Sequence, residues 1–383
     1  MKVLWFIPTS GDGHYLATTE QGRSTRFGYL KQVAQAADEL GFYGALLPTG
    51  RFCEDAWVYA SSLIPLTRQL RFLVALRPGL FSPAVSSRMA ATFDRISNGR
   101  LLINVVTGGS TVDLAADGVH LEHDQRYELT DEFLTVWREL FSGEAVNFEG
   151  SHLKIVNGRR GFEAIQKPYP PLWFGGSSAA AHQTAAKHAD VYLMWGEPPH
   201  QIAEQVANVR RLAEAEGREV RFGIRLHIIV RETEQAAWDA ANDLIRYVDD
   251  EAINAVQSLQ HYSESVGQAR MRALHNGQKK NLEVYPNLWA GVGLVRGGAG
   301  TALVGNPDQI ARLMQEYADL GVDTFILSGY PHLEEAYRTA ELLFPRIPLS
   351  EEHTLPQDNI AQGYEFTRQA FSHLVSNGKV NGA

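Results

Sequence analysis

The chain has 383 residues, of which 44% are hydrophobic and 21% charged, a composition typical of a globular protein with a large buried core. A formal net charge of −9 argues against nucleic acid or anionic lipid as a partner. The apolar runs fall short of the roughly 20 residues that cross a bilayer, and the N-terminal run is too short for a signal peptide. A single cysteine cannot form an internal disulfide, so we expect a soluble protein of the reducing cytoplasm.

Short apolar runs alternate with amphipathic segments along the chain. Eight runs are predicted strands: 3–8, 44–49, 71–76, 101–107, 172–176, 190–195, 220–230 and 323–329. The segments between them have helical spacing, as in 83–98, where Met89, Phe93 and Ile96 recur at i, i+4 and i+7. Strands that alternate with helices form a parallel sheet. Eight repeats favour an α/β fold of the (β/α)₈ TIM-barrel type, with a doubly wound open sheet as the alternative.

The pattern predicts one barrel domain over residues 1–348, interrupted twice. Residues 143–171 indicate a hairpin before the fifth strand. Residues 250–302, after the seventh strand, combine a helical stretch with a glycine-rich segment and are predicted to form a long mobile lid, because loops of this length in compact domains are usually functional. Residues 349–383 are expected to form a polar C-terminal tail.

The seventh strand carries the most informative polar residues. Ile224 and Leu226 share one face by the two-residue period of a strand, and Arg225 and His227 share the other. In a barrel the apolar face packs against the helices, so Arg225 and His227 are predicted to point into the lumen. A buried arginine needs a partner. An internal acid would serve, but the inner faces offer few carboxylates, so the pattern favours an anionic ligand.

Further polar side chains follow the ends of other strands, where barrel enzymes build their sites. They are Ser10 after the first strand, Cys53 after the second, Trp195 after the sixth, and Tyr330 and His332 after the eighth. A lone cysteine is more often a small buried hydrophobe, and a tryptophan here is as easily a core or rim residue. These positions are therefore candidates by location alone.

A phosphate site is indicated by GGSSAAAH at 175–182, where Ser177 and Ser178 lead into an alanine-rich helix. The helix N-terminus attracts anions, although a serine cap is common without a ligand. The glycines of 291–300 do not have the dinucleotide-binding spacing. His120 and His123 lack a third ligand at persuasive spacing, so no metal site is predicted.

Longer motifs, in collinear order from residue 3 to about 345, resemble the FMNH₂-dependent alkanesulfonate monooxygenases of the bacterial-luciferase-like superfamily. They include GDGHYL, TGRFCEDAW, LINVVTGG, PYPPLWFGGSS, WGEPP, RFGIRLHIIVRET, NLWAGVGLVRGGAGTALVG and LSGYPHLEEAYR. The resemblance implies a TIM barrel and a two-component enzyme. A separate NAD(P)H-dependent flavin reductase would supply FMNH₂, and O₂ would be used to cleave the carbon–sulfur bond of an organosulfonate to sulfite and an aldehyde. It also implies a homo-oligomer, commonly a tetramer.

The resemblance assigns roles to residues that match the family motifs. Arg225, His227, Trp195 and Tyr330 would bind the sulfonate and take part in proton transfer. Arg296 would close over the site from the lid, Cys53 would lie close to the flavin, and His332 near the opening. FMN would be held by Asn104, Thr107, His123, Tyr127, Ser177 and Ser178. The identity of the catalytic base stays open, with Arg225 or Arg296 as hypotheses.

One position departs from the family pattern. Ser10 stands where relatives carry histidine, at the end of the first strand. A smaller hydroxyl side chain suits a wider, more polar pocket for a sulfosugar such as sulfoquinovose, and neutral drift is an equal explanation. The sequence is also compatible with a related oxygenase for a long alkane, a nitrogen heterocycle or a sulfone, with a barrel that binds the deazaflavin F420, and with a non-catalytic binding paralogue.

Overall fold

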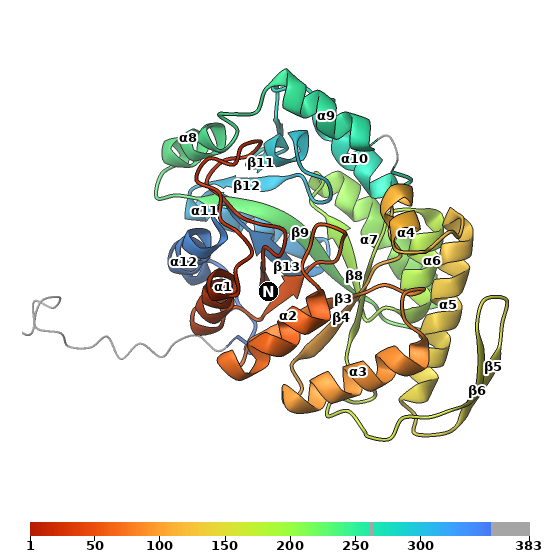
Figure 1. Ribbon diagram of the computed structural model, residues 1–383. Helices are drawn as coiled ribbons and strands as arrows, with labels where there is room; N and C mark the ends of the chain where they lie inside the picture. The colour runs from red at the N-terminus through yellow and green to blue at the C-terminus, as the bar shows by residue number, and fades with distance from the viewer. Residues whose placement is uncertain (261–262, 354–383) are drawn as a thin grey trace, which may run out of the picture.

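Eight parallel strands close into a barrel in the structure, a computed structural model that describes residues 1–260 and 263–353 (Figure 1). In barrel order they are β1 (Lys2–Phe6), β2 (Gly44–Leu47), β3 (Arg71–Leu76), β4 (Leu101–Val105), β7 (Leu172–Gly175), β8 (Val191–Trp195), β9 (Arg221–Val230) and β13 (Val322–Ser328). The ring is closed because β9 pairs with both β8 and β13, and β13 pairs with β1. The predicted TIM barrel is confirmed, and the open sheet is excluded.

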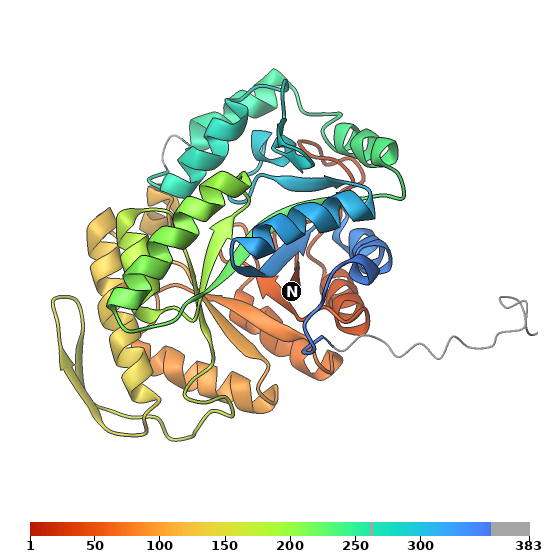
Figure 2. The same ribbon diagram turned by 180° about the vertical axis from the view of Figure 1, so that it is seen from behind.

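Helices surround the barrel on its outer side (Figures 1 and 2). They are α1 (Phe27–Glu39), α2 (Ala56–Leu63), α3 (Pro83–Ile96), α4 (Thr111–Ala116), α5 (His123–Leu140), α6 (Ala179–His188), α7 (Pro199–Ala215), α8 (Glu234–Leu244), α9 (Asp250–Gln260), α10 (Val266–His275), α11 (Pro307–Asp319) and α12 (His332–Leu342), with short 3₁₀ helices at Ile64–Leu66, Gly291–Leu294 and Phe344–Arg346. No helix among the described residues is both long and apolar enough to cross a membrane.

Two insertions leave the barrel at the ranges singled out in the sequence. The first is an antiparallel hairpin of β5 (Val146–Glu149) and β6 (Lys154–Gly158), which projects from the body of the molecule (Figure 2). The second contains α9, α10, β10 (Glu283–Tyr285) and β11 (Leu288–Trp289), and it returns through β12 (Ala302–Gly305). β12 pairs with the last part of β9, beginning at His227, just beyond the point where β8 ends at Arg225. The second insertion therefore comes back beside the polar end of β9.

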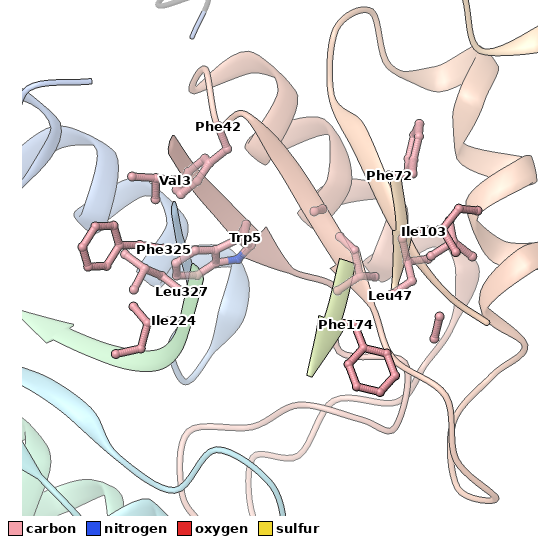
Figure 3. Close-up of a cluster of buried hydrophobic side chains, with 14 of the residues drawn as sticks. Val3, Trp5, Phe42, Leu47, Phe72, Ile103, Phe174, Ile224, Phe325 and Leu327 are labelled. Carbon is pink, nitrogen blue, oxygen red and sulfur yellow. The ribbon is translucent and has the colours of Figure 1, made fainter. Parts of the chain in front are cut away.

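The side chains of each barrel strand divide between two apolar layers, as their alternation predicts. The outer layer lies between strands and helices and includes Trp5, Phe174 and Ile224 (Figure 3). The lumen holds a separate cluster with Leu4 and Phe6. The full lumen cluster is Leu4, Phe6, Tyr43, Leu46, Leu73, Leu102, Trp173, Val191 and Ile326, with Leu193 packed against it. The apolar side chains of this cluster fill the lumen below the cavity at the carboxyl ends of the strands.

The first residues of the predicted tail pack against the amino end of the barrel. His353 Nε2 accepts a hydrogen bond from Val3 N at 3.1 Å, and its Nδ1 lies 2.8 Å from Gly41 O. Glu352 forms an ion pair with Lys2 at 2.6 Å. The remainder of that predicted tail, residues 354–383, lies outside the described residues.

Buried histidines make the stability of this fold dependent on pH. The pKa is lowered, chiefly by burial, for His182, His188, His227, His275 and His353. The unfolded chain therefore binds more protons below its ordinary histidine pKa near 6.5, so the free energy of unfolding falls as the pH drops through that value. At pH 5.5 each histidine that stays neutral contributes a loss of up to about 1.4 kcal/mol.

Urea unfolding at pH 7.5, 6.5 and 5.5 measures this dependence. Replacing His188 with glutamine is expected to reduce the slope of unfolding free energy against pH. The reason is that one imidazole, neutral in the native state and protonated in the unfolded chain, is then absent. The matched control replaces His200, whose side chain is exposed. Stability that is flat or rises toward pH 5.5 would contradict the expectation.

Candidate active site

A cavity of about 390 Å³ opens at the carboxyl ends of the strands, between the barrel and the second insertion. This volume is within the range of about 300–1,000 Å³ found for small-molecule and cofactor sites. Eight of the residues predicted from the sequence line it together: Asn104, Thr107, His123, Tyr127, Ser177, Ser178, Trp195 and Arg225. Six predicted residues are not part of this lining: Ser10, Cys53, His227, Arg296, Tyr330 and His332. Several of them lie on the far side of Arg225.

The ring of Phe6, at the end of β1, links the two groups of residues. The guanidinium of Arg225 lies 4.7 Å from the centre of this ring, and that of Arg296 lies 5.8 Å from it. His332 packs on the same ring at 5.6 Å. Phe6 thus forms an apolar platform on which two cations converge, one from the barrel and one from the lid.

Arg225 points into the lumen, as predicted, and is only 6% exposed. Its Nη2 donates to Ser328 Oγ at 2.7 Å, and its Nη1 donates to the backbone oxygens of Leu226 and Ile326. Among the described residues no carboxylate forms an ion pair with it. Burial, with a smaller effect from Arg296, lowers its pKa to about 9, so it remains a cation at neutral pH. The charge is held by neutral oxygens and is available to an anion.

Arg296 reaches the same place from the loop between η2 (Gly291–Leu294) and β12. Its Nη1 donates to Gly297 O at 3.0 Å and to Ala299 O at 3.3 Å, which are contacts within its own loop. Within the described part of the chain it forms no ion pair. Among residues 1–260 and 263–353, neither of these two guanidinium groups is paired with an acid.

His227 and Tyr330 stack beside these cations, with ring centres 5.4 Å apart and planes inclined by 18°. His227 is 1% exposed, and its pKa is lowered well below the ordinary value by burial and by the charges of Arg225 and Arg296. The imidazole is therefore neutral at neutral pH. A neutral imidazole can both donate and accept a hydrogen bond, whereas the guanidinium groups can only donate.

His332 forms hydrogen bonds with the buried carboxylate of Asp12. Its Nδ1 lies 2.9 Å from Asp12 Oδ1, and its backbone N–H donates to Asp12 Oδ2 at 2.8 Å. Tyr29 also donates its hydroxyl to Asp12. These bonds tie the segment after β1 to the start of α12, and they leave His332 to contact the site through Phe6 and Tyr330.

Cys53 and Ser10 lie at the edge of the site. Cys53 is half-buried, and burial raises the pKa of its thiol, which keeps the sulfur protonated at neutral pH and weakens it as a nucleophile. Arg296 is close enough to oppose that shift. Ser10 is exposed near the start of the loop after β1. The structure thus places Cys53 near the lid arginine and Ser10 at the surface.

The opposite end of the cavity is polar and surrounds the N-terminus of α6. Ser178 caps this helix by accepting a hydrogen bond from Ala181 N at 3.1 Å. Gly176 permits a close approach, since an added Cβ would lie 2.7 Å from the Ala181 Cβ and 3.3 Å from the Tyr127 hydroxyl. Free backbone N–H groups at a helix N-terminus, with hydroxyl groups around them, form a suitable cradle for phosphate.

Between the polar end and Arg225 the cavity wall is apolar, formed by Leu46, Leu193 and Ile326. Asn104, on β4, faces this region, and its side-chain amide has no hydrogen-bond partner among the described residues. A flat ring system with polar edges would find both an apolar surface and an amide here. The donor set of the cavity therefore fits FMN: Asn104 would serve the edge of a flat ring, and the N-terminus of α6 would serve an anionic tail.

The second insertion closes the cavity through two ion pairs. Glu197, which is 1% exposed and follows β8, binds Arg270 on α10 with both oxygens at 2.9 Å from Nε. Arg126 on α5 binds Glu264 just before α10 at 2.7 Å. Between them, Gly267 of α10 packs so closely on Trp195 that an added Cβ would lie 3.1 Å from the indole. These contacts hold the second insertion against the cavity.

Two important residues were missed in the sequence. Phe6 and Ser328 both lie on inward faces of predicted strands, and Ser328 is two residues beyond Ile326 on the same face of β13. The period-2 rule could have found Ser328, but a lone serine near a strand end carries no signal of its own. Only its contact with Arg225 shows its importance.

A model of the luciferase-like monooxygenase family matches residues 1–324 of the chain. The chain belongs to the luciferase-like monooxygenase family. The resemblance noted in the sequence is thereby confirmed at the level of this flavin-dependent family, and the narrower alkanesulfonate assignment belongs to the proposed function.

Solved structures show the same fold at low sequence identity. The long-chain alkane monooxygenase LadA is 20% identical with a TM-score of 0.74, covering 90% of this chain and 89% of its own. The riboflavin lyase RcaE, solved with modified FMN and riboflavin, is 20% identical with a TM-score of 0.73 and 90% coverage of both chains. DmoA from Hyphomicrobium sulfonivorans is 19% identical with a TM-score of 0.72, covering 90% of this chain and 87% of its own.

Proposed function

We propose that this member of the family is a two-component monooxygenase, which uses FMNH₂ and O₂ to cleave the carbon–sulfur bond of an organosulfonate. The observation that carries the proposal is the pair Arg225 and Arg296, which converge on the Phe6 ring with no carboxylate partner among the described residues. A sulfonate is a permanent anion at neutral pH. A planar guanidinium fork matches its oxygens, and charge-assisted hydrogen bonds in a buried site are strong.

Each residue of the site has a separate proposed role, which follows from its position. Arg225 binds and orients the sulfonate, and Arg296 adds a second charge and closes the site. His227 is the neutral group that stacks on Tyr330 beside them. Trp195 and Tyr330 form the walls. The lid residues from Glu264 to Gln268 cover the cavity and exclude water, which favours productive chemistry on a reactive cofactor.

FMN would be held by Asn104, Thr107, His123, Tyr127, Ser177 and Ser178, which share one cavity. When bound as FMNH₂, it would supply the electrons for reduction of O₂. A separate flavin reductase would deliver it in reduced form, which agrees with the lack of dinucleotide-binding spacing in the glycines of 291–300. Binding of F420 in place of FMN is the competing assignment, and fluorescence titration with each cofactor separates them.

Alanine variants of Ser177 and Ser178 should distinguish an effect on cofactor affinity from an effect on helix stability. Ser178→Ala removes the cap of α6 and is expected to lower the free energy of unfolding by about 1 kcal/mol. Ser177 caps no helix and forms a long contact of 3.5 Å to Gln205, so Ser177→Ala should change stability little and weaken FMN binding by about tenfold. Urea unfolding and fluorescence titration measure the two effects. Unchanged FMN affinity in Ser177→Ala would contradict the assignment of Ser177 to the phosphate.

The substrate is tested by sulfite release in a coupled reaction with a flavin reductase. A simple alkanesulfonate and sulfoquinovose should be compared in the native protein and in a Ser10→His variant. If the serine widens the pocket, the variant should lose activity toward sulfoquinovose and keep activity toward the alkanesulfonate. Equal effects on both substrates would remove the pocket argument, and no sulfite from any sulfonate would overturn the proposed function.

A further inference from the structure

A continuous chain of hydrogen bonds joins Arg225 to the loop that returns from the lid. Arg225 Nη2 donates to Ser328 Oγ at 2.7 Å, and Ser328 Oγ lies 2.8 Å from His227 Nδ1. On the other side of the ring, His227 Nε2 lies 3.1 Å from Ala299 O. Ser328 is fully buried and His227 is 1% exposed, so water does not replace these contacts.

In this series of hydrogen bonds, each donor can be matched with an acceptor in only one direction. The Ala299 carbonyl only accepts, so the proton of a neutral His227 belongs on Nε2. Nδ1 is then an acceptor and requires the hydroxyl proton of Ser328. Ser328 Oγ accepts in turn from Arg225, which has only donors. Arg225 therefore donates a hydrogen bond to Ser328, Ser328 donates to His227, and His227 donates to the Ala299 carbonyl.

The charges around His227 agree with a neutral ring. Arg225 lies beside it on β9, Arg296 approaches from the lid, Tyr330 stacks on its face, and His332 lies beyond Tyr330. Asp12 is engaged by His332 and Tyr29 rather than by His227. Since no acid contacts the imidazole among the described residues, hydrogen bonds rather than an ion pair select its tautomer.

We propose that Ser328 is a positioning residue that couples the lid to Arg225, by locking His227 as the Nε2-protonated tautomer while the Ala299 carbonyl is in place. The inference deepens the proposed function and rests on it, because Arg225 is the residue assigned there to the substrate anion. If the lid withdraws, Nε2 loses its acceptor and the proton can move to Nδ1. Nδ1 then donates to Ser328 Oγ, so the hydroxyl hydrogen must turn to another acceptor and the serine oxygen is shared between His227 and Arg225, which weakens its hold on the guanidinium.

Nitrogen NMR of histidine-labelled protein, without cofactor or substrate, reports the tautomer directly. The signal of His227 is assigned by comparison with His227→Gln. We expect the two ring nitrogens of the native protein to show the Nε2-protonated form at neutral pH. Ser328→Ala and Arg296→Ala should each shift the signals toward a mixture of tautomers, the first by removing the donor to Nδ1 and the second by releasing Ala299.

Matched variants separate positioning from packing. Thr324→Val removes another fully buried hydroxyl from β13, one that donates to Asp323 at 2.6 Å, and it should keep the native tautomer. Ser328→Thr keeps the hydroxyl and should retain both the tautomer and kcat. Ser328→Ala should lower kcat by about tenfold to a hundredfold with little change in KM. If the alanine variant does not fold, Ser328→Cys, which has a similar size and a weaker donor, should show the mixed signals.

The proposal is overturned if the native protein carries its proton on Nδ1. It is also overturned if Ser328→Ala and Thr324→Val give the same nitrogen shifts and the same kcat. A protein that releases no sulfite but shows these tautomer changes would contradict the proposed function alone, since the NMR measurement needs no substrate.

Discussion

Replacing Arg225 with methionine is expected to lower kcat/KM for sulfite release by about 10²- to 10³-fold, while the free energy of unfolding stays the same or rises. The activity falls because the buried charge that would bind the sulfonate is lost. The stability does not fall, because Arg225 is 6% exposed without an acidic partner, and an unpaired buried charge is itself destabilising. Methionine is apolar and fills much of the same volume.

Arg225→Lys sharpens this test. Lysine keeps the charge but cannot reproduce the planar fork or its bonds to three oxygens, so we expect an intermediate loss of about tenfold or more. Full sulfite release in the lysine variant would remove any role of the guanidinium in proton transfer. Full release in the methionine variant would remove Arg225 from substrate binding altogether.

Arg231, directly after β9, provides the matched control for stability. It binds Glu335, which is 1% exposed, with contacts of 2.9 and 3.0 Å. Arg231→Met leaves this buried carboxylate with Arg338 alone, so the free energy of unfolding should fall by at least about 1 kcal/mol. Opposite effects of methionine at 225 and 231 would support a functional charge at 225. A loss of stability in both would indicate that Arg225 is structural.

Arg296→Ala is expected to produce the second large effect, in the coupling of O₂ consumption to sulfite. The variant loses one of two charges over Phe6 and the bonds that hold Gly297 and Ala299, so the lid should close less well. We expect kcat/KM to fall by about tenfold to a hundredfold. More of the O₂ consumed should appear as hydrogen peroxide, because water reaches the site.

Oxygen uptake, hydrogen peroxide and sulfite measured in the same reaction give the coupling ratio. Arg272→Ala is the control, since Arg272 lies on the lid helix α10 outside the lining of the cavity. It should keep the native ratio. If both variants lose coupling equally, the effect belongs to general loosening of the lid, and the specific role of Arg296 is wrong.

The sequence predicted the barrel well because its signals are local. All eight strands and the face of β9 that carries Arg225 and His227 follow from residue spacing within a few positions. Of the predicted cofactor residues, only Ser177 and Ser178 were indicated by a local motif, the turn from β7 into α6, whereas Asn104 and Tyr127 were assigned by the family resemblance. The family resemblance supplied the chemistry that spacing could not.

Residue spacing in the sequence could not predict contacts between residues far apart in the chain. Asp12 binds His332 across 320 positions, and Arg225 binds Ser328 across 103, so closure of the barrel decides both. The absence of an acid near Arg225 within the described residues is a property of the whole lumen. Local periodicity thus determined the strands and which way each side chain faces. Only the tertiary structure decided which side chains meet, because hydrogen bonds and charge pairing depend on distances of a few ångströms set by packing.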